Sequence, residues 1–200
     1  MLEAIDITAR RGTALLFTRM RLRVDAGRAL LVTGRNGSGK TTLLRILAGL
    51  TQPEDGTVTL NGSTNSTMRA HIGFAGHAAA LKDELTVAEN LRALAALGGE
   101  AVTSDALSGA LATVDLASQR DLPARALSAG QRRRVSLARL ALLPRALWLL
   151  DEPATALDTA GIRVLGDLVA QRLREGGIVV AATHQALEWP ADRSDNMALA

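Results

Sequence analysis

One glycine-rich segment, residues 34–41 with the sequence GRNGSGKT, constrains the fold of this chain more than any other. It follows the apolar run Ala29–Thr33, which predicts a buried strand. It precedes Thr42–Ala48, a helical pattern that Gly49 would end as a C-terminal cap. A glycine-rich turn between a strand and a helix, closed by Lys-Thr, is typical of a phosphate-binding loop. The sequence therefore predicts a strand–loop–helix unit built around a nucleotide phosphate site.

The residue types in this segment suit phosphate chemistry. Glycines let the backbone curl so that successive N–H groups point inward, and the N-terminus of a helix adds partial positive charge. We expect Lys40 to span the β- and γ-phosphates and the Thr41 hydroxyl to ligate Mg²⁺. The predicted nucleotide-binding residues are Gly34, Arg35, Asn36, Gly37, Ser38, Gly39, Lys40, Thr41 and Thr42.

Composition limits the other functions open to the chain. Its 200 residues suit one domain with a sizeable core. The absence of cysteine excludes thiol nucleophiles and disulfides, and four aromatic residues (two Trp, two Phe) are too few for a platform that stacks single-stranded nucleic acid. No apolar run approaches the roughly 20 residues that span a bilayer, and the N-terminus lacks the apolar stretch of a signal peptide. We expect a cytosolic chain whose membrane attachment, if any, comes through a partner.

The first third of the chain has a mixed β pattern. Leu2–Thr8 and Leu15–Val24 alternate apolar and polar residues as half-buried strands do. A third strand is predicted at Thr57–Leu60, followed by Asn61-Gly62, which is a hairpin signal. Ile72–Ala75 predicts another short strand.

The middle of the chain is predicted to be helical. Thr86 and Glu89 have the spacing of a capping box at the start of a helix that Gly98-Gly99 would end. The spacing of Leu107, Leu111 and Val114 indicates a second helix. We therefore expect a helical insertion over residues 78–143.

The last part returns to alternating strands and helices. Ala146–Leu150 is a continuous apolar strand, a helix is predicted over residues 160–174, and Ile178–Ala182 is another buried strand. Short buried strands separated by helices are typical of a largely parallel sheet.

Two further segments carry candidate site residues. The strand at residues 146–150 runs into Asp151 and Glu152; after a phosphate loop, Asp151 would hold Mg²⁺ and Glu152 would polarise an attacking water. Ser128 and Gly130 lie at the predicted start of another helix. Their residue types fit an anion-binding helix end and a plain N-cap equally well.

In their order and spacing, five motifs resemble those of the ATP-binding-cassette ATPases. They are Gly34–Thr41, Leu127–Gln131, Leu150–Pro153, Ala156–Asp158 and Thr183-His184. The resemblance spans essentially the whole chain. It implies an α/β fold of the P-loop NTPase class, with a RecA-like parallel-sheet core, an N-terminal antiparallel β part and an inserted helical subdomain. We expect one domain over residues 1–200, with residues 1–77 and 144–200 in the core and residues 78–143 in the helical subdomain.

The resemblance also implies roles for residues. Two cassettes would form a homodimer with two ATP molecules and Mg²⁺ between them, and Asp158 would lie at the interface. Ser128, Gly130 and Gln131 would contact the ATP of the opposite subunit. Lys40, Glu152 and His184 would be catalytic, with His184 on the γ-phosphate. Mg²⁺ would be held by Thr41 and Asp151.

Two positions depart from the usual pattern of the family. His77 stands where most cassettes have a glutamine that senses Mg²⁺ and the membrane partner. We therefore expect His77 to couple the nucleotide site to the membrane partner. Arg11-Gly12 stands where many cassettes stack an aromatic residue on adenine. Arg11 could stack through its guanidinium plane, or the base could be loosely held.

The runs Gly76–Leu91 and Leu147–Asp158, together with the short length, are similar to the cytochrome c maturation cassettes, the ATP-binding subunits of haem exporters. That group implies an integral-membrane partner subunit (CcmB-like) and a peripheral place on the cytoplasmic face of the bacterial inner membrane. Ala78, Ala79 and Leu81 would either floor a groove for that partner or simply pack in a helix. Because the chain has no Cys-x-x-Cys-His motif, we expect no direct haem binding.

Three other functions compete with this interpretation: the ATPase subunit of another small-substrate transporter, a cassette acting on nucleic acid, and a small P-loop kinase. The Leu-Ser-x-Gly-Gln run disfavours the kinase. The nucleic-acid relatives carry long insertions or paired cassettes that 200 residues cannot hold, so we expect no nucleic-acid partner.

Overall fold

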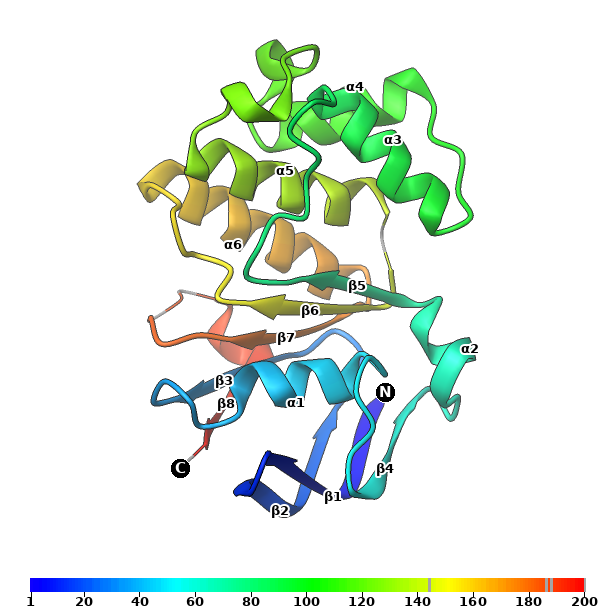
Figure 1. The fold of residues 1–200 in the computed structure, drawn as a ribbon, viewed down its shortest axis with the longest axis vertical. Helices are drawn as coiled ribbons and strands as arrows, with labels where there is room; N and C mark the ends of the chain where they lie inside the picture. Colours follow the sequence, from blue (N-terminus) through cyan, green and yellow to red (C-terminus); the bar gives the residue numbers. More distant parts are fainter. Residues whose placement is uncertain (144, 186, 188, 200) are drawn as a thin grey trace.

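The computed structural model describes residues 1–143, 145–185, 187 and 189–199. Its strands form two sheets (Figure 1). The smaller sheet is antiparallel, in the order β2-β1-β4, and consists of β1 (Leu2–Arg11), β2 (Ala14–Val24) and β4 (Asp55–Leu60). The larger sheet is parallel, in the order β5-β6-β7-β3-β8, and consists of β3 (Ala29–Gly34), β5 (Ile72–Ala75), β6 (Leu147–Asp151), β7 (Ile178–Ala182) and β8 (Ser194–Leu199). The expected α/β fold with a parallel core sheet and an antiparallel β part is confirmed.

Helices cover both faces of the parallel sheet. They are α1 (Lys40–Leu47), α2 (Asn65–Arg69), α3 (Val87–Leu97), α4 (Ser104–Thr113), α5 (Ala129–Leu142) and α6 (Thr159–Arg174). Helix α1 packs on β6 and β7 from the side of the small sheet, whereas α5 and α6 lie on the other face. Figure 1 shows α3 and α4 beyond α5, farthest from the small sheet. No described helix is both long and apolar enough to cross a bilayer.

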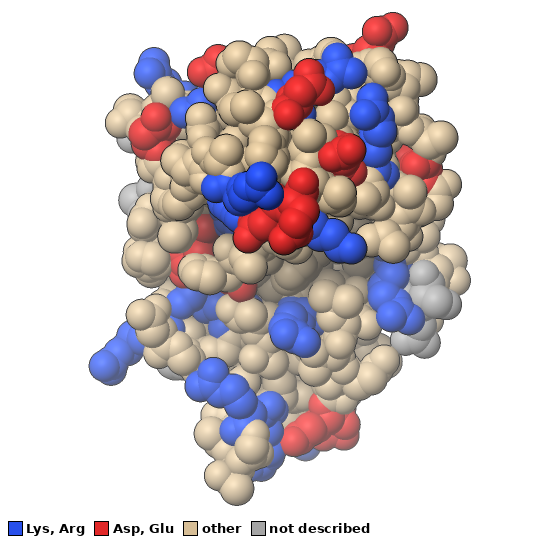
Figure 2. Space-filling view, turned by 45° about the horizontal axis from the view of Figure 1, so that its top comes forward, with Lys and Arg blue, Asp and Glu red and all other residues tan. Residues whose placement is uncertain are grey.

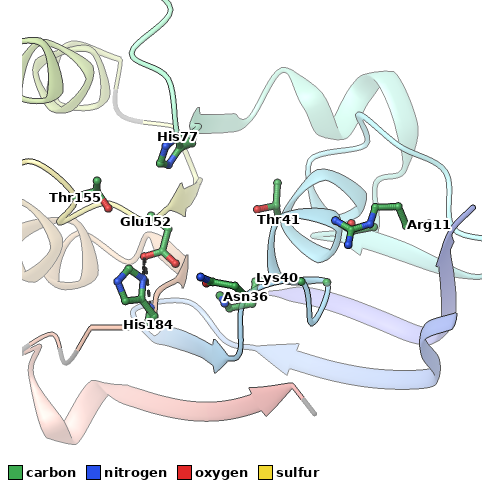
Figure 3. Close-up of a pocket in the computed structure, with 11 residues that line it drawn as sticks. Arg11, Asn36, Lys40, Thr41, His77, Glu152, Thr155 and His184 are labelled. Carbon is green, nitrogen blue, oxygen red and sulfur yellow. Dashed lines mark hydrogen bonds and ion pairs between the residues drawn. The ribbon is translucent and has the colours of Figure 1, made fainter. Parts of the chain in front are cut away.

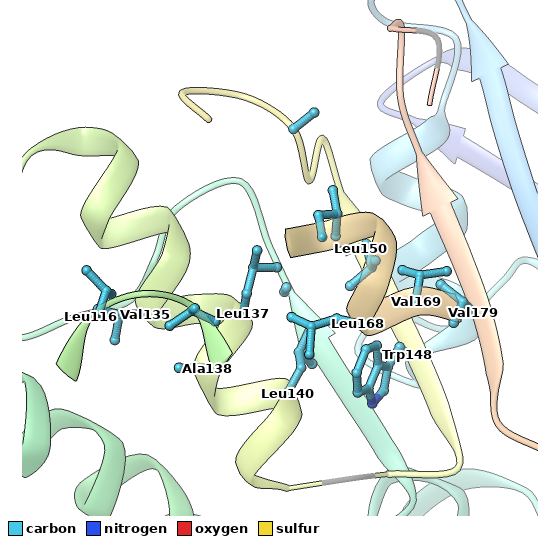
Figure 4. Close-up of a cluster of buried hydrophobic side chains, with 14 of the residues drawn as sticks. Leu116, Val135, Leu137, Ala138, Leu140, Trp148, Leu150, Leu168, Val169 and Val179 are labelled. Atoms are coloured by element: carbon cyan, nitrogen blue, oxygen red, sulfur yellow. The ribbon is translucent and has the colours of Figure 1, made fainter. Parts of the chain in front are cut away.

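Strand β6 shows why the sheet must be covered on both faces. All five of its residues are buried. Leu147 and Leu149 face the core around α1, while Trp148 and Leu150 face the core under α5 and α6 (Figure 4). Successive side chains of a strand point to opposite faces, so a continuous apolar strand requires an apolar layer on each side.

The predicted capping box is also present. The Thr86 hydroxyl accepts from the Glu89 amide at 3.2 Å, and the Glu89 carboxylate accepts from the Thr86 amide at 2.8 Å. The two following helices bury Leu91, Leu107 and Leu111 against α5. The domain boundaries at residues 77 and 78 remain a prediction, and positions 144 and 200 lie outside the described residues.

At Asn61-Gly62 the structure has the expected turn, but the second strand of the expected hairpin is wrong. Both residues have positive φ, 50° and 77°, and Leu60 pairs with Ser63 across them. No second strand follows, because the next residues are polar and begin α2 at Asn65. The alternative that Ala78, Ala79 and Leu81 pack in a helix is also wrong, since α3 begins only at Val87.

Replacement of Leu111 by Ala should lower the free energy of unfolding by about 2–5 kcal/mol, because Leu111 is fully buried and the change leaves a cavity. Leu97→Ala is the matched control: Leu97 is 86% exposed, and the loss should stay within about 0.5 kcal/mol. Urea unfolding followed by circular dichroism measures both. Equal losses would show that the helical layer does not form the core described here.

Candidate functional site

The phosphate loop connects the end of β3 to the start of α1. Gly34, Gly37 and Gly39 all have positive φ, at 147°, 88° and 99°. At Gly34 the requirement is steric as well, because an added Cβ would lie 2.6 Å from the Leu199 carbonyl oxygen and 2.8 Å from Ser38 Oγ. The N-cap of α1 is Gly39, and no described side chain caps the first amides of this helix. The loop therefore ends on the kind of helix terminus that binds anions.

Lys40 lies beneath this loop. It is only 7% exposed, and its Nζ donates to the carbonyl oxygens of Gly34 at 2.7 Å and Arg35 at 3.1 Å. A buried ammonium that is bonded only to neutral carbonyls has no counter-ion among these partners. Such a group suits an anionic ligand that enters over the loop.

Thr41 and Asp151 bring a hydroxyl and a carboxylate together. The Thr41 Oγ1 donates to Asp151 Oδ2 at 2.9 Å and lies 3.2 Å from Oδ1. Asp151 ends β6 and is 4% exposed. These are the hard oxygen donors that Mg²⁺ prefers. No described group of three or more His, Cys, Asp or Glu side chains could hold a metal alone, so Mg²⁺ here would also need phosphate oxygens.

Glu152 and His184 form a pair at the same edge of the sheet. His184 Nδ1 lies 2.9 Å from Glu152 Oε2, and Figure 3 shows the two side chains pointing toward each other. Glu152 has a φ of +48°, a left-handed conformation that costs about 1–3 kcal/mol for a residue other than glycine. Its amide donates to the Ala182 carbonyl at 2.8 Å, which ties it to β7.

A single open pocket collects most of the predicted site (Figure 3). Its lining residues are Arg11, Asn36, Gly37, Gly39, Lys40, Thr41, Thr42, His77, Glu152, Thr155 and His184. Thr155 has no place in the sequence prediction of the site. Arg11 enters the pocket from the end of β1, at the position considered above for adenine.

Ser128, Gly130 and Gln131, the signature residues of the Leu-Ser-x-Gly-Gln run, line a different pocket together with Asp158 and Arg134. Ser128 is the N-cap of α5: its Oγ accepts from the Gln131 amide at 3.2 Å, and its own amide donates to the Gln131 side chain at 2.9 Å. The N-cap interpretation is therefore confirmed. An anion contact remains compatible with it, because a hydroxyl that accepts one bond can still donate another.

Asp158 lies beside the signature residues and caps α6. Its Oδ1 accepts from the Gly161 amide at 2.8 Å and from Arg134 at 2.7 Å. These two bonds, the amide first, lower the pKa of this exposed carboxyl group. Asp158 is thus a fixed anion next to Ser128, on a surface that is open in the single chain.

Arg133 is the site-adjacent residue that motif reasoning misses. It is 5% exposed and donates to backbone carbonyls at the ends of β5 and β6. The sequence carries a signal for its burial, because Arg133, Leu137 and Leu140 share one face of α5 at helical spacing.

Comparison with known proteins agrees with this geometry. A family described as ABC transporter matches residues 17–155. The cytochrome c biogenesis ATP-binding export protein CcmA of Pseudomonas aeruginosa is 47% identical over 201 residues, which cover 98% of this chain and 99% of that protein. The protein of the same name from Nitrosomonas europaea is 43% identical over 191 residues, 94% of this chain and 90% of its own length.

Solved structures share the fold. An ABC transporter ATP-binding protein from Pyrococcus furiosus superposes with a TM-score of 0.86 at 28% identity, covering 98% of this chain and 96% of its own. A cassette described as dimeric and bound to ADP and Pi has a TM-score of 0.79 at 24% identity over 92% and 88% of the two chains. The chain belongs to the ABC transporter family, in the group of cytochrome c biogenesis ATP-binding export proteins.

Proposed function

We propose that this chain binds and hydrolyses ATP as a subunit of a membrane ABC complex that serves c-type cytochrome biogenesis, by haem export or by release of a haem chaperone. The observation that carries the proposal is one pocket lined by Lys40, Thr41, Glu152 and His184. The names of the relatives supply the cellular process, because nothing in these four residues distinguishes one transported substrate from another.

The pocket residues divide the chemistry of ATP hydrolysis between them. The amides of residues 34–42 and Lys40 would hold the phosphates, so that the ammonium exchanges its carbonyl partners for phosphate oxygens. Thr41 and Asp151 would hold Mg²⁺, which neutralises phosphate charge. Glu152 would accept the proton of an attacking water. A carboxylate can only accept, so His184 Nδ1 would donate in this pair, and Nε2 would face the γ-phosphate. Phosphate oxygens also accept, so that contact would need a proton on Nε2 as well.

We further propose a head-to-tail homodimer of cassettes. Ser128, Gly130 and Gln131 line a pocket apart from the phosphate loop of their own chain. Helix α5 begins there, which gives an anion-ready helix end for the ATP of the opposite subunit. Asp158 would lie at this interface. The dimeric cassette named above supports the arrangement by its shared fold.

We also propose a docking site for the membrane partner. His77 and Ala78 are exposed, and Ala79 and Leu81 are half-buried in an irregular segment before α3. This segment would form the groove that receives a cytoplasmic helix of a CcmB-like subunit, with the chain held peripherally at the inner membrane. His77 also lines the nucleotide pocket, so one side chain would sense both ligands.

The alternative of a cassette acting on nucleic acid is disfavoured by surface charge. On the face in Figure 2, basic side chains prevail over the lower part, but acidic and basic side chains are intermixed over the helical part, so the basic area does not extend across the face as it does on nucleic-acid surfaces. Co-purification with a membrane protein supports the transporter subunit. Retention on DNA at moderate salt would favour the alternative instead.

Lys40→Ala should reduce ATP turnover by about 100-fold or more, because it removes the charge that meets the transferred phosphate. The other lysine of the chain, Lys82, is exposed, and Lys82→Ala is the matched control with unchanged turnover. Phosphate release and binding of a fluorescent ATP analogue are the measurements. Tight ATP binding with normal hydrolysis in Lys40→Ala would contradict the assignment.

Glu152→Gln should trap an ATP-bound dimer, because the amide cannot take a proton and hydrolysis slows by about 10²–10⁴-fold. Size-exclusion chromatography with ATP should show twice the 21.0 kDa mass of one chain. The exposed Glu84→Gln serves as the control and should elute as the parent does. A Glu152→Gln monomer that still hydrolyses ATP would overturn the role of Glu152.

His77→Ala should reduce the stimulation of ATPase activity by the membrane subunit more than the basal rate. The reason is that His77, although it lines the pocket, lies apart from Lys40 and Thr41 (Figure 3). Rates are compared for the isolated chain and for the complex in nanodiscs. If the basal rate collapses, His77 is a catalytic residue and not a coupling residue.

A further inference from the structure

Three consecutive arginines on α5 have different surroundings. Arg132 pairs with Asp83, and Arg134 pairs with Asp115 and Asp158. Arg133 points the other way, into the protein, on the face that also buries Leu137 and Leu140. Charged side chains are almost never fully buried without partners, so the partners of this guanidinium identify what it does.

All of the hydrogen bonds that Arg133 makes go to backbone carbonyl oxygens among the described residues. Its Nη2 donates to Asp151 and to Glu152, each at 2.7 Å, and its Nε donates to Pro153 at 3.1 Å. Its Nη1 donates to Gly76 at 2.6 Å. Three acceptors are consecutive residues, the last of β6 and the two that follow it, and the fourth precedes His77. The planar fork of an arginine can serve this set, whereas a lysine is a single point charge.

The contact with Glu152 falls on a strained peptide. Glu152 is in the left-handed conformation, with its amide bonded to Ala182 and its carbonyl bonded to Arg133. These two bonds fix the backbone from both sides, and the side chain then reaches His184 at 2.9 Å. Residues in such conformations persist only where the surroundings over-determine them.

Electrostatics favour the same arrangement. Burial lowers the pKa of Arg133, while the nearby carboxylates of Asp151 and Glu152 act in the opposite direction. A guanidinium keeps its charge even so. The Arg133 guanidinium therefore places a permanent positive charge next to the backbone of Asp151 and Glu152, the two acidic residues of the site.

We propose that Arg133 is a positioning residue that holds the backbone of Glu152 in its catalytic orientation and joins it to α5 and to the segment that carries His77. The proposal rests on the role given to Glu152 above. Movement of α5 when the opposite subunit's ATP binds at Ser128 would reach the Glu152 backbone through the Arg133 side chain.

The test compares Arg133→Lys and Arg133→Gln with Arg139→Gln. Arg139 is the matched control: it lies on the same helix, burial lowers its pKa too, and it donates to the Phe74 carbonyl, outside the pocket. We expect kcat to fall about 10- to 100-fold in both Arg133 variants, as for a misplaced catalytic group, with ATP affinity and KM within about threefold of the parent. Arg139→Gln should lose thermal stability but keep its kcat per folded molecule.

Unchanged kcat in both Arg133 variants, or an equal loss in Arg139→Gln, would overturn the proposal and leave Arg133 a structural residue. Failure of the parent chain to bind or hydrolyse ATP would instead refute the proposed function. If the Arg133 variants do not fold, the Arg133 Nε–H resonance of the parent chain decides. It should be protected from solvent exchange and should shift when a non-hydrolysable ATP analogue binds; a resonance that does not shift would refute the link.

Discussion

The direction of the five strands in the larger sheet is the constraint on which the site depends. Because the strands are parallel, their carboxyl ends all meet at one edge. Gly34 ends β3, Asp151 ends β6, and the segments after β5 and β7 carry His77 and His184. Four stretches far apart in the sequence thus reach one pocket without any long loop. The chemistry of the site follows from the topology of the sheet and from which residues stand at these ends.

Much of the fold could be predicted because its strong signals are local. A short stretch of sequence is enough to predict each of these elements: the phosphate loop, the capping box at Thr86, and the apolar strands at residues 147–151 and 178–182. Strand β8 has no such pattern: its sequence, SDNMAL, is half polar, and only pairing with β3 makes it a strand. The turn at Asn61-Gly62 was correctly indicated by residue type, but whether a strand follows depends on neighbours that a local pattern does not contain.

The same distinction applies to the site. Lys40, Asp151 and Glu152 could be named in advance because each belongs to a contiguous motif with its own chemistry. Arg133 could not, because its partners are carbonyl oxygens, which every residue has, and only the fold determines which of them it meets. Ser128 is an intermediate case. The Ser128 hydroxyl begins a helix by accepting a bond and still has its own proton to donate, so the structural and the proposed functional interpretation concern the same atom.

The close approach of Gly34 to Leu199 has a consequence for folding during synthesis on the ribosome. The phosphate loop leaves a strand whose edge partner, β8, comes from near the other end of the chain. Pairing over such a separation is slow and must wait for synthesis of the late segment. The β3–β8 ladder, and with it the contact of Gly34 with Leu199, can therefore form only after residues 194–199 have been synthesised.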